Sequence, residues 1–277
     1  MKKQILPLLA TVGALTLTSC FQSETVIHLK KDGSGTIVEE TSFGEQMKTM
    51  MAQMSALGGE GADKGKDPMA EMFSEEKGKK KAAALGEGVT FDKVEKVKLG
   101  DRDGYRVTYK FADINKVKFD PGDATESMKP PGADGEEEED KAKKSDPITF
   151  TYASGNLTIH MPKPDPKAKK EGDDSKEEEE DPQAAQQEAM MKQMFADMKI
   201  SVRLTADDGI AKTDATYNSG GTITLMEMDF GKLMKDPTAF KKLQKANPQT
   251  PEEIEATLKG VEGIKMESKP EVTATLK

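Results

Sequence analysis

The chain has 277 residues, a formal net charge of −9 at pH 7, no tryptophan and a single cysteine. This acidic balance excludes a general affinity for nucleic acid or for anionic lipid headgroups, and one cysteine excludes an internal disulfide framework. Charged residues make up 33% of the chain and hydrophobic residues 35%, so we expect a modest core and a part of the chain that does not fold.

The first 20 residues have the layout of a secretory signal peptide. Lys2-Lys3 forms a basic start, an apolar run extends from Ile5 to Leu17, and the segment closes with the sequence Leu-Thr-Ser-Cys at 17–20. This ending resembles the lipobox of bacterial lipoproteins, in which signal peptidase II cuts before the cysteine. The resemblance implies that residues 1–19 are removed, and that Cys20 becomes the mature N-terminus and carries a thioether-linked diacylglycerol.

Two other interpretations of this segment compete with the lipobox. A transmembrane helix needs about 20 apolar residues, whereas this run is shorter and contains Pro7. An ordinary secretory signal would leave Cys20 as an unpaired thiol in an oxidising compartment. A lipidated Cys20 accounts better for the single cysteine, and two or more acyl chains anchor a protein stably. We therefore expect a lipid-anchored protein of the cell membrane or outer membrane that faces the periplasm or the exterior.

The first elements after Cys20 are predicted to be a hairpin followed by helices. Strands are expected at 24–31 and 35–41, joined by a turn at Asp32-Gly33. Ser42–Glu45 is typical of a capping box, and Asp67-Pro68 predicts a second helix that runs toward the basic residues 77–81. The first helix carries its methionines at helical spacing, namely Met47, Met50, Met51 and Met54.

The middle of the chain combines strands with two acidic tracts. Strands are predicted at 89–99 and 105–111, and the second presents one apolar face made by Tyr105, Val107, Tyr109 and Phe111. A strand pair at 148–153 and 156–161 separates the tracts 121–147 and 162–181, which are rich in Pro, Gly, Lys and Glu. We expect both tracts to be disordered. Cation binding is the alternative, but consecutive like charges extend a chain and do not give the ligand spacing of a calcium loop.

The last third of the chain is predicted to start with a second methionine-rich helix at 182–198. Strands follow at 200–205, 210–217 and 221–228, then helices begin at Asp236 and Thr250, and strands at 264–267 and 272–276 end the chain. The predicted fold is α+β, a single domain over 20–277 in which an antiparallel sheet built from hairpins has amphipathic helices packed on one face. The methionine-rich helix, which we expect to cover the strand at 105–111, carries on one face Met190, Met191, Met194, Phe195 and Met198.

The methionine stripes have three interpretations. Met fills irregular gaps in cores, forms adaptable apolar binding surfaces, and ligates Cu(I) through its thioether. Helical spacing favours the first two. His28 and His160 lie at positions on the polar faces of predicted strands, and the chain has no H-E-x-x-H or G-x-S-x-G motif. We therefore expect no catalytic residue, no metal site and no cofactor.

These observations favour a non-catalytic binding or assembly role at a membrane surface, with an envelope protein as a partner besides the membrane. The alternative is a carrier of an apolar or lipid ligand in a groove lined by the methionine stripes. An enzyme with an unrecognised carboxylate site and a copper-binding protein are less favoured. A carrier should contain a contiguous apolar cavity of ligand size, whereas a scaffold should have a filled core.

Overall fold

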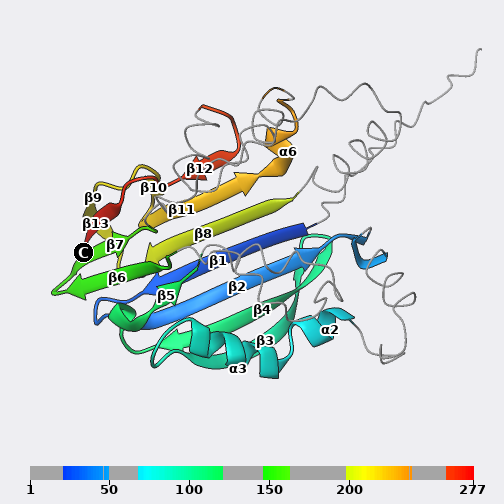
Figure 1. Cartoon of the computed structure of the whole chain (residues 1–277), viewed down its shortest axis with the longest axis horizontal. Coiled ribbons are helices and arrows are strands. Elements are labelled where there is room, and N and C mark those ends of the chain that lie inside the picture. The colour runs from blue at the N-terminus through cyan, green and yellow to red at the C-terminus, as the bar shows by residue number, and fades with distance from the viewer. Residues whose placement is uncertain are drawn as a thin grey trace, which may run out of the picture.

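The computed structural model describes residues 21–45, 47–49, 68–120, 146–162, 198–236, 238 and 260–277. Within these residues the protein is a mixed α and β structure that is dominated by strands and has few helices (Figure 1). None of the helices in this part of the chain is long and apolar enough to cross a membrane. The two acidic tracts lie almost entirely outside the described residues.

Eight strands form the large sheet, in the order β10-β11-β8-β1-β2-β4-β3, with β12 paired to β11. Its central strand β1 buries every second side chain, from Phe21 to Leu29, so that one face of the sheet is the core face. The strands of this sheet are β1 Phe21–Leu29, β2 Gly35–Phe43, β3 Thr90–Leu99, β4 Arg102–Phe111, β8 Lys199–Ala206, β10 Asn218–Ser219, β11 Thr222–Asp229 and β12 Ile264–Met266.

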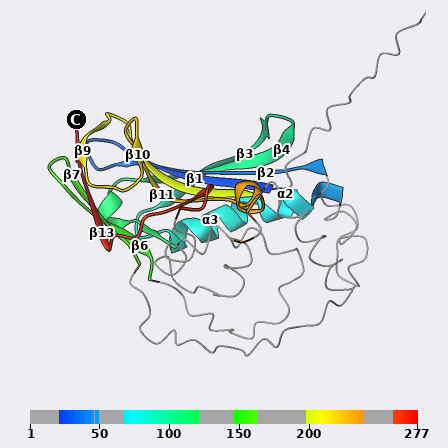
Figure 2. The ribbon, with the colours of Figure 1, turned by 90° about the horizontal axis from the view of Figure 1, so that it is seen from above.

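Five strands form the small sheet, in the order β5-β6-β7-β13-β9. It lies beneath one end of the large sheet and at an angle to it (Figure 2). Buried residues of both sheets belong to one hydrophobic cluster, so the two sheets share a core. The strands are β5 Lys118–Phe119, β6 Ile148–Ala153, β7 Asn156–His160, β9 Ile210–Thr213 and β13 Glu271–Leu276, with a 3-10 turn at Ile114–Lys116 before β5.

Three predicted hairpins are present. β1 and β2 meet at a turn in which Gly33 has a φ of 86°, a conformation that favours glycine. β3 pairs with β4, and β6 pairs with β7, both antiparallel. The predicted apolar face of β4 is confirmed, because Tyr105, Val107, Tyr109 and Phe111 are all buried. On the opposite face Arg106 and Lys110 are not buried, but Thr108 is, so that face is not exposed throughout.

The expectation of one antiparallel sheet is wrong in two respects. β1 and β8 pair in parallel, from Gln22 opposite Lys199 to Leu29 opposite Ala206. The strands predicted at 200–205 and 210–217 do not lie in one sheet, because β8 pairs with β11 in the large sheet while β9, which ends at Thr213, pairs with β13 in the small sheet. The turn between β8 and β9 therefore carries the chain from one sheet to the other.

The helices also differ from the expectation. The helix predicted at Asp67-Pro68 does begin at Pro68, but it is divided into α2 (Pro68–Met72) and α3 (Glu75–Ala84). Ser42 does not cap a helix, since it lies in β2 and its hydroxyl is buried without a hydrogen bond. The helical residues 45 and 47–49 follow Gly44, whose carbonyl accepts from the backbone N–H of Lys48 at 3.1 Å. An additional short helix, α6 (Phe230–Leu233), follows β11.

Helices α2 and α3 lie against the core face of the large sheet (Figure 2). The ring of Phe73, between the two helices, stacks on Tyr105 with 4.8 Å between centroids. The face of β4 that we expected the stripe from Met190 to Met198 to cover is therefore contacted by a different segment. Met198 is buried, but the rest of that stripe lies outside the described residues, so its packing stays a prediction.

Candidate functional site

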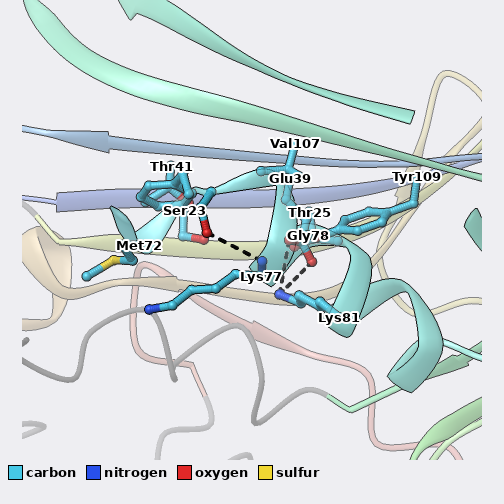
Figure 3. Close-up of a pocket in the computed structure, with 12 residues that line it drawn as sticks. Ser23, Thr25, Glu39, Thr41, Met72, Lys77, Gly78, Lys81, Val107 and Tyr109 are labelled. Carbon is cyan, nitrogen blue, oxygen red and sulfur yellow. Dashed lines mark hydrogen bonds and ion pairs between the residues drawn. The ribbon is translucent and has the colours of Figure 1, made fainter. Parts of the chain in front are cut away.

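A pocket lies between the core face of the large sheet and the helices α2 and α3 (Figure 3). We call it the α2–α3 pocket, and its cavity volume is about 100 Å³. Strands β1, β2 and β4 line it with Ser23, Thr25, Glu39, Thr41, Val107 and Tyr109. The helical segment lines it with Met72, Phe73, Ser74, Lys77, Gly78 and Lys81.

The sheet wall of this pocket is unusually polar for a core face. Ser23 and Thr25 are in phase with Phe21 and Ile27 on β1, so strand alternation points their hydroxyls into the protein. Ser23, Thr25 and Thr41 are at least nine-tenths buried, and among the described residues none of their side chains forms a hydrogen bond. In the described part of the chain only Ser42 Oγ and Arg102 Nε are fully enclosed without a partner, so the hydroxyls of Ser23, Thr25 and Thr41 reach the pocket space and can bond a small polar guest there.

An ion pair closes one side of the α2–α3 pocket. The ammonium of Lys81 on α3 lies 2.8 Å from one carboxylate oxygen of Glu39 on β2 and 3.0 Å from the other. The hydroxyl of Tyr109 donates to the same carboxylate at 3.5 Å. Burial raises the pKa of Tyr109, and the negative charge of Glu39 raises it further, so the phenol is neutral. The pair fixes α3 over β2. The hydroxyls of Ser23, Thr25 and Thr41 are the part of the wall that makes no hydrogen bond to the described residues.

The predicted site residues are mostly outside the described part of the chain. Met47 is half-buried against the core and Met198 is fully buried. Cys20, Met50, Met51, Met54, Met190, Met191, Met194 and Phe195 are not among the described residues. The α2–α3 pocket contains one methionine, Met72, and is smaller than the roughly 300–1,000 Å³ of ligand sites for larger organic molecules. The methionine-lined groove of the carrier hypothesis lies mostly outside the described residues and stays a prediction.

The two histidines bond to acidic side chains on outward strand faces. Nδ1 of His28 lies 3.3 Å from Oδ1 of Asp207, and Nδ1 of His160 lies 3.1 Å from Oε1 of Glu271. Nε2 of His160 also contacts the Thr151 hydroxyl at 2.9 Å. Among the described residues, no three His, Cys, Asp or Glu side chains are grouped so that they could hold a metal ion.

Glu267 is a fully buried carboxylate outside the α2–α3 pocket. It accepts hydrogen bonds from the backbone N–H and the hydroxyl of Thr216, at 2.7 and 2.9 Å, and from the backbone N–H of Lys269 at 3.2 Å. These bonds connect the segment after β9 with the segment between β12 and β13. The carboxylate is thus occupied by structural contacts.

The residues of the α2–α3 pocket were not predicted from the sequence. Strand alternation alone carried a usable signal, because Ser23 and Thr25 have the same parity as Phe21 and Ile27, and Thr41 has the parity of Ile37. Polar residues in phase with an apolar face are unexpected in a core and indicate either a hydrogen-bonded network or a cavity. Glu39 shares this parity, and its partner Lys81 comes from a distant helix.

No protein-family model and no curated protein matches this sequence. Among solved structures, the NMR structure of the folded domain of the LppM protein of Mycobacterium tuberculosis aligns with 77% of this chain and 85% of its own length. The TM-score is 0.31 and the sequence identity is 7%. A TM-score this low does not establish a common fold.

Proposed function

We propose that this chain is a lipoprotein of the bacterial cell envelope that is anchored through lipid on Cys20 and has a non-catalytic binding or assembly role at the membrane surface. One observation supports the anchor most directly. The basic start, the apolar run and the lipobox end at Cys20, and β1 begins at the next residue, Phe21. Cleavage before Cys20 would therefore leave every described strand intact.

The acidic net charge of the protein fits an anchor made of acyl chains. An acidic protein gains little from anionic headgroups, and a single acyl chain holds a protein only marginally, whereas the two or more chains of a lipoprotein hold it stably. For the binding role, the α2–α3 pocket is the candidate site, because it combines three hydroxyls that make no hydrogen bond to the described residues with the ion pair of Lys81 and Glu39.

The anchor is tested with a pair of neighbouring substitutions. Cys20→Ala should abolish incorporation of labelled fatty acid, leave the uncleaved precursor and change the membrane fractionation, because the acceptor thiol is gone. Ser19→Ala keeps a small residue before the cysteine and should mature like the wild type. Metabolic labelling and intact mass measure both. Normal maturation of Cys20→Ala in the membrane fraction would refute the proposal.

The assembly role is tested by comparing two forms of the same domain in living cells. One is the wild-type protein, and the other carries Cys20→Ala behind an ordinary secretory signal, so that it is exported without lipid. Chemical crosslinking followed by purification should recover an envelope protein with the first form and much less of it with the second. Equal recovery would show that the partner does not require the membrane-anchored state.

A further inference from the structure

The first residue after the lipobox cysteine is already part of the folded core. Phe21 is the first residue of β1, only 2% of its surface is exposed, and it packs edge-on against Phe43 with 5.5 Å between ring centroids. It is paired with Phe43 in the antiparallel ladder of β1 and β2, and Gln22 is paired with Lys199 in the parallel ladder of β1 and β8. No flexible spacer separates this strand from Cys20.

In an anchored protein, the connection between the lipidated residue and β1 would be short and fixed. Successive Cα atoms are about 3.8 Å apart, so Phe21 is one such step from the residue that would carry the lipid. Phe21 has pairing partners on β2, and its neighbour Gln22 has them on β2 and β8, so the strand start does not act as a free tether. The side chain of Gln22 is held as well, because its Oε1 accepts a hydrogen bond from the guanidinium of Arg102 at 2.5 Å.

We infer that the end of the large sheet at which β1 starts lies directly on the headgroup layer of the bilayer. We call it the anchor end. It includes the start of β1, the end of β2 at Phe43, and the turn between β3 and β4 at Asp101. This inference rests on the proposed lipidation of Cys20 and adds to it a fixed orientation of the domain.

The opposite end of the sheet then points away from the membrane. β1 has nine residues, so its two ends are about 26 Å apart at the usual rise of a strand. The turn after β1 contacts the small sheet, where the Tyr152 hydroxyl donates to the carbonyl of Lys31 at 2.7 Å. The small sheet is therefore on the side of the molecule that is available to partners outside the membrane (Figure 1).

The charges at the anchor end are compatible with a headgroup layer. Lys48 is paired with Glu45 and, at 2.6 Å, with Asp103, and Lys199 is opposite Asp229 in the sheet. Basic and acidic side chains thus alternate around the start of β1. A surface that carries charges of both signs is neither strongly attracted to a headgroup layer nor strongly repelled by it. The covalent lipid and its short connection to β1 therefore decide the position of the domain.

The test uses single cysteines as probe sites, because Cys20 is the only cysteine and its thiol is consumed by lipidation. Asp101→Cys places a probe at the anchor end and Lys31→Cys places one at the opposite end, and both positions are exposed. The full-length variants are matured in cells, checked for lipid by intact mass, labelled with a fluorophore and inserted into vesicles of phosphatidylethanolamine and phosphatidylglycerol. A fraction of the headgroups carries a nitroxide quencher.

The probe at position 101 should be quenched at least about threefold more strongly than the probe at position 31, because the strand separates them by about 26 Å. A 12-residue Gly/Ser insertion between Cys20 and Phe21 should remove the difference, since such a linker reaches about 20 Å. Equal quenching at both positions in lipidated, vesicle-bound protein would overturn the fixed orientation. Absence of lipid on Cys20 would instead refute the proposed function, and the mass measurement separates the two outcomes.

Discussion

Arg203 connects three strands on the outward face of the large sheet. From β8 it donates to Glu24 on β1 and, at 2.8 Å, to Glu227 on β11. Lys265 on β12 donates to the same Glu227 at 3.1 Å. Burial raises the pKa of Glu227, but the hydrogen bonds from Arg203 and Lys265 outweigh this, so the pKa lies below its usual value. The carboxylate is therefore more stable as an anion in the folded protein.

We predict that Arg203→Met lowers the free energy of unfolding by about 1–3 kcal/mol at pH 7, because Glu227 loses one of its two cationic partners. A depressed pKa contributes stability above the unfolded value of about 4.3, and this contribution disappears as the pH falls through the folded pKa. The difference between the wild type and the variant should therefore shrink below about pH 4. Urea unfolding of the non-lipidated protein from pH 7 to pH 3 measures it.

Arg106→Met is the matched control for this prediction. Arg106 pairs with Glu40, and its side chain is 39% exposed, compared with 27% for Arg203. An exposed pair of this kind contributes at most about 1 kcal/mol. Equal losses in the two variants, or a loss in Arg203→Met that does not change with pH, would contradict the assignment of a pH-dependent contribution to Glu227.

At the scale of elements, the contact between α3 and β3 depends on a glycine in the helix. Gly78 is buried, and a Cβ atom added to it would lie 2.5 Å from the ring of Phe91 on β3. That ring packs edge-on against Tyr109 with 6.3 Å between centroids, so a shift of Phe91 would disturb the wall of the α2–α3 pocket. The glycine permits the close approach of helix and sheet.

We predict that Gly78→Ala fails to stabilise the protein, although the same change at an open helical position adds about 1 kcal/mol. Overpacking against Phe91 should turn the expected gain into a loss of about 1–3 kcal/mol. Thermal and urea unfolding measure the change. Ala83→Gly, at an exposed position of the same helix, should cost about 1 kcal/mol through helix propensity alone. A more stable Gly78→Ala protein would show that α3 has room to move from the sheet.

At the scale of the whole molecule, the long acidic segment between β5 and β6 has its two ends side by side. Phe119 is opposite Ile148 and Lys118 is opposite Thr149 in the antiparallel ladder. A short turn can join strands in this arrangement. The segment from β7 to β8 is different, because it must connect the small sheet with the large sheet.

We predict that replacing residues 121–146 with a four-residue turn that contains Asn-Gly leaves the fold and its cooperative unfolding intact. Closing a shorter loop costs less entropy, so stability should be unchanged or higher by about 1–2 kcal/mol. Circular dichroism and urea unfolding measure the result. Replacing residues 163–197 with the same turn is the comparison and should prevent folding. Loss of the fold in the first variant would show that the acidic tract contributes contacts to the core.

The sequence by itself determined which apolar residues of β4 face inward and where the hairpin turns before β2 and β7 lie. β4 illustrates this, because the alternation of Tyr105 with polar neighbours is a local record of its environment. The Asp32-Gly33 turn is equally local, since only its own backbone geometry is involved. The lipobox-like sequence at 17–20, on which the proposed anchor rests, is a linear motif and involves no tertiary contact.

Only the tertiary structure decided which strands are neighbours and which polar residues share a cavity. The parallel pairing of Val26 with Arg203 joins strands far apart in the chain, and no periodicity specifies a partner. For the same reason, the transfer of β9 to the small sheet and the ion pair between Glu39 and Lys81 were not predictable. Alternation records that a side chain is buried, whereas the partner that buries it depends on how distant segments pack.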